Sequence, residues 1–203
     1  MLSIIIVGIN GWEEYTRPLI NGIWAHHPDV ELCVIDNASE KPYPDAPHIH
    51  RLPERVCYSA AINKGISLTT QPWILVLNND VKCGGAFEED ITKLDPNAIY
   101  GMELYREETF IWLSSWIFAI DRETFRKVGE FDTQFEVCAY EDVDYCYRAH
   151  KLGIPTKLMR LPFQHYLGKT RWGIAGYENI RLNNRKKFEK KHNLVFKPRT
   201  YYE

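Results

Sequence analysis

Short apolar runs alternate with amphipathic segments through the first half of the chain. Each run is too short for a core helix and ends in polar residues, a pattern that predicts buried strands over Ser3–Ile9, Glu31–Ile35 and Trp73–Leu77. Apolar residues at helical spacing predict helices over Glu13–His26, Tyr58–Ile66 and Gly85–Leu94. The order strand, helix, strand, helix, strand, helix argues for a parallel sheet covered by helices. Lys41–Pro53 holds four prolines and is predicted to be a loop.

The pattern changes after Ala98. Phe110–Ile120 is rich in aromatic and β-branched residues, which predicts antiparallel strands. Beyond it we expect helices over Arg122–Val128, Glu141–Leu152 and Gly176–His192, and a strand over Ile154–Leu158. The fold class is therefore α/β: a mostly parallel, Rossmann-like sheet with flanking helices and a smaller mixed region. We expect one domain over residues 1–203, with a nucleotide-binding half (1–97) and an acceptor-side half (98–203).

Composition narrows the class of protein. With 203 residues, 45% hydrophobic, the chain can bury a substantial core, and its net charge of −2 gives no reason to expect a nucleic-acid partner. It contains no run of 18 apolar residues and no signal-peptide pattern, and its five cysteines lack CxxC spacing, so we expect a cytoplasmic protein with reduced thiols. From Arg171 onward the net charge is +6. This basic segment is either a solvated helix or a contact for an anionic acceptor or a membrane surface.

Polar side chains follow each of the three predicted parallel strands. Asn10 follows the first, Asp36 the second, and Asn78-Asn79-Asp80 the third. In a doubly wound sheet such tips lie near one another, and ligands bind beside them. Asp36 could accept a hydrogen bond from a base or a ribose hydroxyl, or simply cap a turn. Asp80 beside neutral amides suits a divalent cation and a phosphate-bearing ligand, although an ordinary Asn/Asp turn has the same pattern.

Two further side chains could serve the same ligand. Lys64 supplies a point charge suited to a diphosphate, or is a surface lysine. His165 follows the last predicted strand and could complete a metal site with Asp80, although a lone histidine is more often structural. The chain has no Walker lysine motif, GxGxxG or HExxH, which disfavours P-loop, dehydrogenase and hydrolase functions.

Three carboxylates open the predicted helix that begins at Glu141. Glu141, Asp142 and Asp144 are favoured there by the helix dipole, but capping needs only one of them and they repel one another. A carboxylate held at a helix start and facing a cleft can accept a proton from an acceptor hydroxyl, and Asp142 is the best placed. Asp144 and Arg148, four residues apart, are expected to form a structural pair.

With these residues in order, the sequence resembles, nearly end to end, the GT-A-fold, family-2 type of inverting, nucleotide-sugar-dependent glycosyltransferases. The resemblance is carried by Ser3–Asn10, Val34–Ser39, Ala60–Ile66, Leu77–Asp80, Gly129–Asp132 and Glu141–Arg148. The segment Leu77–Asp80 is similar to the family's DxD motif, with Asn78 at its first position. The remaining carboxylate, Asp80, is then expected to bind metal modestly, or only together with the donor.

The resemblance implies a role for each motif residue on the donor side and in the chemistry. Asp36 would contact the base or ribose, with Asn10 nearby, while Asn63, Lys64 and Asn79 would line the ribose-diphosphate site. Asp80 would ligate Mn²⁺ or Mg²⁺, and His165 stands where some relatives place a metal ligand. Asp142 would be the general base, with Glu141 beside it.

On the acceptor side, the resemblance implies roles for Trp112, Trp116 and Asp144. An indole could stack on a sugar ring there, although a core role for either tryptophan is equally consistent with the sequence. The expected reaction moves a sugar, from a UDP-sugar by preference, to a hydroxyl of a glycan in polysaccharide or glycoconjugate biosynthesis. A nucleotidyltransferase and a non-catalytic nucleotide-sugar-binding module are the alternatives.

Overall fold

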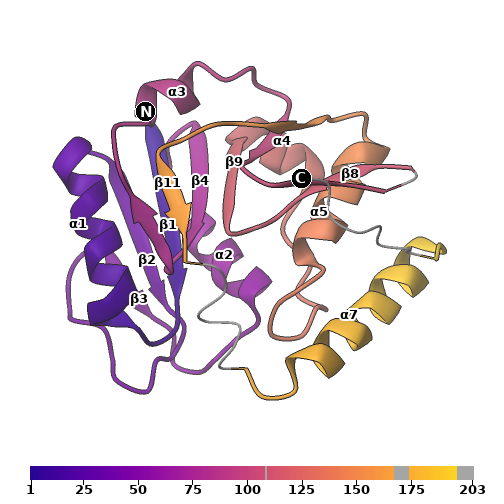
Figure 1. The fold of residues 1–203 in the computed structure, drawn as a ribbon, viewed down its shortest axis with the longest axis horizontal. Coiled ribbons are helices and arrows are strands. Elements are labelled where there is room, and N and C mark those ends of the chain that lie inside the picture. The colour runs from indigo at the N-terminus through magenta and orange to yellow at the C-terminus, as the bar shows by residue number, and fades with distance from the viewer. Residues whose placement is uncertain (108, 167–173, 196–203) are drawn as a thin grey trace.

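The computed structural model of the protein describes residues 1–107, 109–166 and 174–195. Its strands are β1 (Leu2–Gly8), β2 (Glu31–Asp36), β3 (Ile49–Arg51), β4 (Trp73–Asn78), β5 (Val81–Cys83), β6 (Ile99–Gly101), β7 (Leu104–Arg106), β8 (Ile111–Leu113), β9 (Ile117–Asp121), β10 (Thr156–Leu158) and β11 (Phe163–His165). Its helices are the π-helical turn η1 (Trp12–Thr16), α1 (Arg17–His26), α2 (Tyr58–Ser67), α3 (Glu88–Thr92), α4 (Arg122–Val128), α5 (Glu141–Lys151) and α7 (Tyr177–His192) (Figure 1).

A seven-stranded sheet in the order β10-β6-β9-β4-β1-β2-β3 forms the centre of the molecule. β1 runs parallel to β2 and β4, β2 to β3, and β10 to β6. β9 is antiparallel to both of its neighbours, β4 and β6. The predicted mostly parallel α/β sheet is therefore confirmed, and strands from both halves of the sequence contribute to it.

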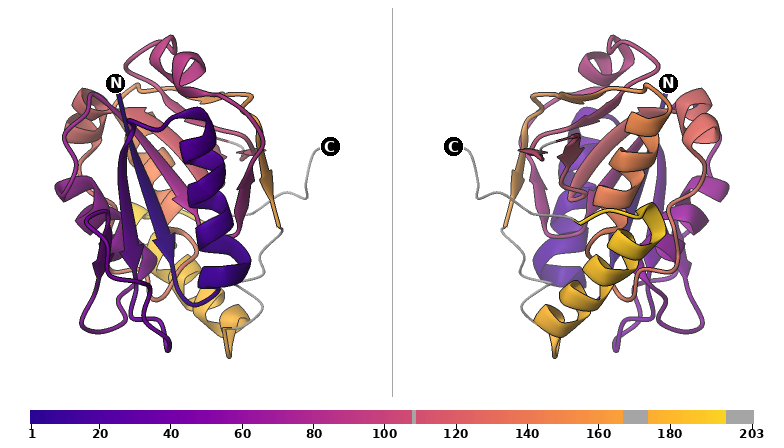
Figure 2. Two further views of the ribbon diagram at one scale, coloured as in Figure 1. Left: turned by 90° about the vertical axis from the view of Figure 1, so that its left-hand side faces the viewer. Right: turned by 90° about the vertical axis from the view of Figure 1, so that its right-hand side faces the viewer.

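Helices cover both faces of this sheet (Figure 2). Along β1, Ile4 and Ile6 pack with α1, α3 and the small β5–β11 sheet, whereas Ile5 and Val7 pack with α2, α4 and α5. This alternation follows from the two-residue period of a strand, and it explains why β1 reads as a continuous apolar run. Both faces of the sheet are covered at its centre, and β1, β2 and β4 are almost entirely buried.

Two local predictions differ from the structure. The predicted loop Lys41–Pro53 contains the short edge strand β3, which pairs with β2 through Val34 and Ile49 and gave no apolar run to recognise. The predicted helix Gly85–Leu94 is helical over Glu88–Thr92 alone, because the preceding residues form β5 and the backbone of Gly84 bonds to Pro162 instead. The other predicted strands and helices are confirmed to within a few residues.

The acceptor-side half adds a small core of its own beneath α7. Phe188 of α7 is fully buried and packs with Phe110, Phe135, Tyr140 and Val143. In Figures 1 and 2, α7 lies along the outside of α5, away from α1. All five cysteines are free thiols. Within the described residues, no helix has both the length and the apolar composition that crossing a membrane requires.

Candidate active site

The ends of β1 and β4 meet around a buried amide. Asn79, 2% exposed, donates from Nδ2 to the Asn10 carbonyl at 3.2 Å and to Thr16 Oγ1 at 3.1 Å. The Tyr43 hydroxyl donates to the same Asn10 carbonyl at 2.7 Å. Gly8 allows this approach, because a Cβ there would lie 2.5 Å from the Tyr43 hydroxyl oxygen. The predicted convergence of the strand tips is therefore confirmed.

Asp36, at the end of β2, organises the loop that follows it. Its carboxylate is fully buried and accepts from Ser39 N at 2.8 Å, Tyr43 N at 3.1 Å and Arg51 Nη1 at 2.6 Å. Burial raises the pKa of Asp36, but these hydrogen bonds outweigh burial and hold it below its usual range. Both oxygens are engaged by this chain's own donors, so a base or ribose contact by Asp36 stays a prediction.

Asn63 and Lys64 lie on α2, one to two turns beyond Tyr58, the residue of this helix that contacts the tip of β4. Asn63 braces the backbone of Phe131, donating to its carbonyl at 2.8 Å and accepting from its N–H at 2.9 Å. Lys64 is exposed. Burial raises the pKa of the Cys33 thiol in the middle of β2, and the positive charge of Lys64 partly offsets this rise. Lys64 stands six residues beyond Tyr58, about 9 Å along the helix axis at 1.5 Å per residue. Contact of either residue with a donor diphosphate stays a prediction.

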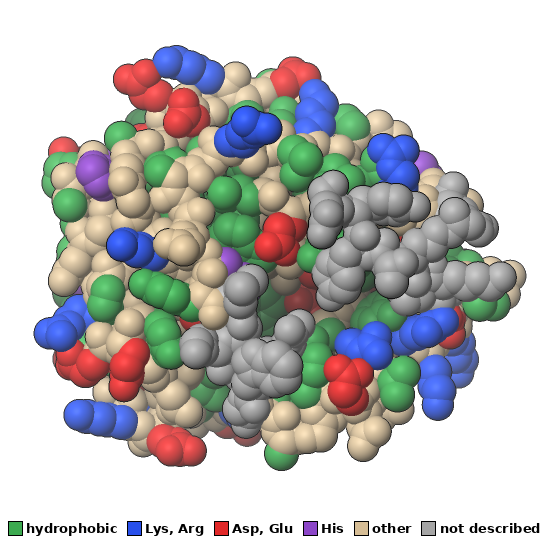
Figure 3. Space-filling model, in the orientation of Figure 1, with side chains coloured by type: hydrophobic (Ala, Val, Ile, Leu, Met, Phe, Trp, Pro, Cys, Tyr) green, Lys and Arg blue, Asp and Glu red, His purple; other side chains and the backbone are tan. Residues whose placement is uncertain are grey.

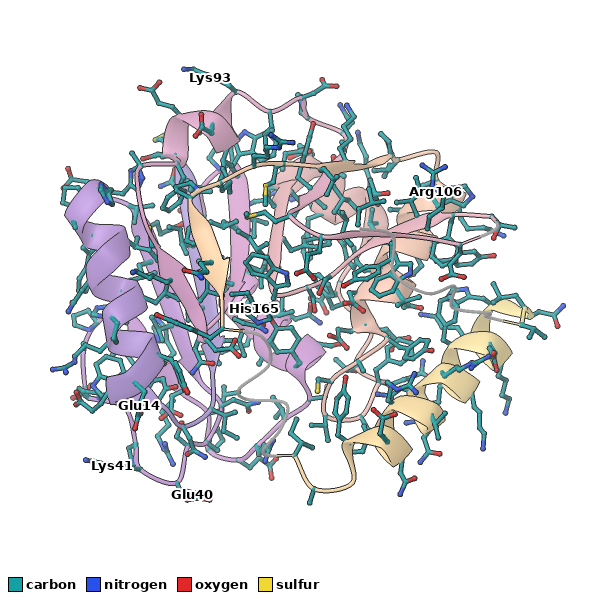
Figure 4. All side chains as sticks on the ribbon, viewed as in Figure 1. Glu14, Glu40, Lys41, Lys93, Arg106 and His165 are labelled. Atoms are coloured by element: carbon teal, nitrogen blue, oxygen red, sulfur yellow. The ribbon has the colours of Figure 1, made fainter. Side chains whose placement is uncertain are left out.

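Asp80 and His165 are brought together by the pairing of β5 with β11, which places His165 opposite Val81. Asp80 is 1% exposed, and its Oδ1 lies 3.4 Å from His165 Nε2. The imidazole stacks on the indole of Trp116, with ring centroids 4.8 Å apart and planes 5° from parallel. Figure 4 shows His165 near the middle of the molecule, at the end of β11. The juxtaposition of Asp80 and His165 predicted from sequence is confirmed.

The chemistry of this pair fits a divalent cation in part. A carboxylate oxygen is a natural ligand for Mg²⁺ and Mn²⁺, and an imidazole nitrogen shifts the preference toward the transition metal. Among the described residues, no group of three or more His, Cys, Asp or Glu side chains could hold a metal ion. A diphosphate and water are oxygen ligands of the kind that would complete such a site.

The two predicted acceptor tryptophans are both packed into the fold. Trp116 is 5% exposed and belongs to the main core, which leaves little of its ring for a sugar to stack on. Trp112 is half-buried and stacks on Tyr105, with centroids 4.3 Å apart. The core role that the sequence left open is what the structure describes for Trp116, and acceptor contact by either ring stays a prediction.

Glu141 and Asp142 begin α5 with both carboxyl groups buried, at 3% and 9% exposure. Asp142 accepts from Ser115 N at 3.2 Å and from Val143 N at 2.8 Å, and Glu141 accepts from the Ser115 hydroxyl at 3.2 Å. Burial raises the pKa of both carboxyl groups, and for Glu141 the negative charge of Asp142 raises it further. A carboxylate in such surroundings is a stronger base than one in water.

Tyr58, at the start of α2, links the tip of β4 to the start of α5. Its hydroxyl donates to Asn78 Oδ1 at 2.5 Å. Burial raises the pKa of Tyr58 well above its usual value, and the charges of Glu141, Asp80 and Asp142 raise it further. The Tyr58 hydroxyl also lies 3.4 Å from the carbonyl of Ser115, whose N–H and hydroxyl bond Asp142 and Glu141, so Tyr58 stands between the tip of β4 and the start of α5. Figure 3 shows acidic side chains in a hollow near the middle of this face. Neither Tyr58 nor Ser115 stood out in the sequence, since isolated Tyr and Ser residues carry no spacing signal.

Asp144 faces away from this cluster, toward α7. It is fully buried, and its oxygens lie 2.8 Å from Arg148 Nε, 2.6 Å from Lys191 Nζ and 2.7 Å from His192 Nε2. The predicted Asp144–Arg148 pair is confirmed, and acceptor contact by Asp144 stays a prediction. Some basic residues of α7 form ion pairs within the chain: Lys187 pairs with Glu136 and Lys191 with Asp132. Lys186 and Lys190 are exposed.

Three solved structures share this fold over nearly the whole chain. GalNAc-T7 with UDP, GalNAc and Mn²⁺ is 14% identical, with 96% of this chain and 55% of that one covered and a TM-score of 0.65. The mannosyltransferase PcManGT from Pyrobaculum calidifontis with GDP-Man and Mn²⁺ is 14% identical, with 98% and 65% covered and a TM-score of 0.67. TarS of S. aureus is 12% identical, with 97% and 40% covered and a TM-score of 0.65. This chain thus spans less than two thirds of each.

These likenesses define the fold: the protein has the GT-A architecture, the α/β fold in which these glycosyltransferases are built. The sequence narrows the class, because residues 3–94 match the family model described as glycosyl transferase family 2. This match covers a little under half of the chain, and the remainder is related to these glycosyltransferases by its fold alone. A search of curated protein sequences found no significant match.

Proposed function

We propose that this protein moves one sugar from a nucleotide diphosphate donor, a UDP-sugar by preference, to a hydroxyl of a glycan acceptor, with inversion at the anomeric carbon. One observation supports this above the others. Asp80 at the tip of β4 and the Glu141-Asp142 pair at the start of α5 act on the same phenol, Tyr58. A metal-suited carboxylate and a base-suited carboxylate thus share one hollow, as a single transfer reaction requires.

The donor side of this proposal uses the strand tips. Asp80 and His165 would hold Mn²⁺ or Mg²⁺, with the imidazole favouring Mn²⁺. When bound there, such a cation neutralises charge on a departing diphosphate. GalNAc-T7 and the Pyrobaculum mannosyltransferase were solved with Mn²⁺ and with UDP or GDP-Man, which supports a metal and a nucleotide in a fold of this kind. Asn10 and Asn79 would frame the nucleotide, with Asp36 shaping the loop beside them.

In the proposed reaction, one Asp142 oxygen accepts the proton of the acceptor hydroxyl. The acceptor oxygen forms a bond to the anomeric carbon from the side opposite the diphosphate, and the carbon–oxygen bond to the diphosphate breaks. The nucleoside diphosphate leaves with that electron pair, so the anomeric configuration inverts. Because burial raises the pKa of Asp142, it is better matched to proton transfer near neutral pH than an exposed aspartate.

The acceptor would enter over the second half of the chain, near Trp112, Trp116 and Asp144. A Drosophila β1,4-galactosyltransferase 7 of similar fold was solved with xylobiose, which supports a glycan as the acceptor class. We further propose a cytoplasmic location, with the exposed Lys186 and Lys190 face of α7 as the part able to touch an anionic membrane surface.

The test begins with binding. Thermal unfolding is followed with UDP-, GDP- and dTDP-sugars, each with and without Mn²⁺, because a ligand that binds only the folded state raises the melting point by mass action. We expect one donor class to stabilise the protein, and Asp80→Asn to remove the Mn²⁺-dependent part of that shift. Glu54→Gln, an exposed loop substitution, is the control.

Turnover then separates the alternatives. With glycan acceptors present, we expect release of nucleoside diphosphate and a product of inverted configuration by NMR. Asp142→Asn should keep the donor-induced thermal shift and lose transfer by about 10²- to 10⁴-fold, the usual contribution of a general base. Release of pyrophosphate would indicate a nucleotidyltransferase, and binding with no turnover for any acceptor would indicate a binding module. Transfer at the normal rate by Asp142→Asn would refute the base assignment.

A further inference from the structure

The residues directly before Glu141 follow an unusual backbone path. Val137, Ala139 and Tyr140 have φ angles of 55°, 79° and 74°, all in the left-handed region. Non-glycine residues rarely adopt this conformation, and a β-branched valine is among the least suited to it. Such a path persists only where the surroundings impose it. Something outside the loop must therefore hold residues 137–140 in place.

Asn184, at the middle of α7, supplies that restraint. It is fully buried, and its Nδ2 donates to the carbonyls of Glu136 at 2.9 Å, Cys138 at 3.1 Å and Ala139 at 3.0 Å. Its Oδ1 accepts from the Glu136 N–H at 3.0 Å. The carbonyl that Asn184 does not reach, that of Val137, accepts from Tyr58 N at 2.7 Å. The carbonyls of residues 136–139 thus all bond to groups from α7 or α2.

α7 is also anchored by side chains other than Asn184. Phe188, one turn further along, is fully buried in the small core with Tyr140 and Val143. Lys187 pairs with Glu136 at 2.7 Å, and Lys191 pairs with Asp144 at 2.6 Å. Figure 1 shows α7 alongside the loop that leads into α5. The amide of Asn184 is therefore presented to the loop by a helix whose following turns are fixed to the rest of the fold.

We propose that Asn184 is a positioning residue for the proposed transfer reaction: by holding the left-handed loop 137–140, it sets where α5 starts and so where the Glu141 and Asp142 carboxylates point. The inference rests on the proposed function for its catalytic consequence. It assigns a reaction role to α7, which lies outside the segment that matches the family model. Asn184 acts through the backbone and touches no reacting atom in this proposal.

Two substitutions test the role. Asn184→Asp keeps the size and the acceptor for the Glu136 N–H, but it turns an oxygen toward three carbonyl oxygens. Asn184→Ala removes all four hydrogen bonds. Asn183→Ala, an exposed neighbour on the same helix, is the matched control. Amide hydrogen exchange over residues 137–142 reports the loop without any substrate, and kcat and donor KM report the reaction.

We expect both Asn184 variants to speed exchange over residues 137–142 while exchange in β1 and β4 stays as in wild type. We expect kcat to fall about 10- to 100-fold, the loss typical of a misplaced catalytic group, with donor KM changed less than about twofold. Exchange and kcat like those of Asn183→Ala would overturn the proposal. Loss of the cooperative thermal transition in both variants would overturn it too, since Asn184 would then serve the whole fold.

The two proposals fail differently. If the wild-type protein turns over no nucleotide sugar, the proposed function fails, while hydrogen exchange still decides whether Asn184 holds the loop. If transfer is observed and the Asn184 variants keep wild-type kcat, the proposed function stands and the positioning role is refuted.

Discussion

The neighbouring carboxyl groups of Glu141 and Asp142 are buried at a site with few groups that could stabilise their negative charge. Each is at most 9% exposed, and their hydrogen-bond donors are the neutral groups of Ser115 and Val143. Within the described residues, no cationic side chain forms an ion pair with either carboxylate. A buried charge without a cation costs stability, so Glu141→Gln is expected to stabilise the fold.

The size of this effect follows from the raised pKa of Glu141. Below the unfolded-state pKa, about 4.3, both states are protonated, and the stability associated with the raised pKa is fully present. As the pH rises toward the folded-state pKa, the unfolded state ionises first, and wild type loses about 1.4 kcal/mol for each unit of pH. Glutamine has no proton to lose, so the advantage of Glu141→Gln grows over this window. Because the window between the unfolded-state pKa and pH 8 spans several units of pH, we expect an advantage of at least about 2 kcal/mol at pH 8, which corresponds to a melting point at least about 4 °C higher.

Urea and thermal unfolding of both proteins at pH 4.5 and pH 8 measure this difference directly, with Glu54→Gln as an exposed carboxylate control. The advantage should be small at pH 4.5, large at pH 8 and absent in the control. An advantage of equal size at both pH values would show that packing, not ionisation, is responsible. A wild type more stable than Glu141→Gln at pH 8 would refute the reasoning.

Two further substitutions test the bracing carboxylates. Asp36→Asn should lower the free energy of unfolding by about 2 kcal/mol at pH 7, because the half-exposed Arg51 loses its partner. The pKa of Asp36 is depressed, so its contribution is present above the unfolded pKa and is lost as pH falls through the folded pKa. Urea unfolding at pH 7 and pH 3 should therefore show the difference shrinking in acid, and a constant difference would contradict it. Asp144→Asn should cost about 3 kcal/mol and speed hydrogen exchange in α7, since Arg148, Lys191 and His192 share this carboxylate; unchanged exchange in α7 would contradict it.

Local pattern was sufficient to predict the central strands and most helices. β1, β2 and β4 are buried on both faces, so each reads as an apolar run whatever its neighbours are. Arg122–Val128 is capped by Asp121, whose side chain accepts from Thr124 N, and α4 was predicted with its observed bounds. β3 was missed because its existence depends on pairing with β2, a contact between distant parts of the chain that proline-rich sequence does not reveal.

The site was predicted less completely, because a motif indicates which residues matter and not which of their atoms are engaged. Asp36 and Asn63 stand in the expected motifs, yet the polar atoms of both side chains form hydrogen bonds with loop residues of this chain. Asn184 lies 42 positions after Asp142 on a helix whose charge drew attention to its lysines instead. Its role depends on backbone carbonyls, which have no signature in a sequence.

The surroundings of Tyr58 explain why position 78, the first of the DxD-like motif, is an asparagine and not an aspartate. The Asn78 side chain accepts from the Tyr58 hydroxyl, which already lies in the field of Asp80, Glu141 and Asp142. A fourth carboxylate at this position would add to the repulsion among buried negative charges. A neutral amide keeps the acceptor that Tyr58 needs and adds no charge. Under the proposed function the cost would fall on metal binding, since Asp80 and His165 would then draw further ligands from the donor's diphosphate. A cation should therefore bind tightly only together with the nucleotide sugar.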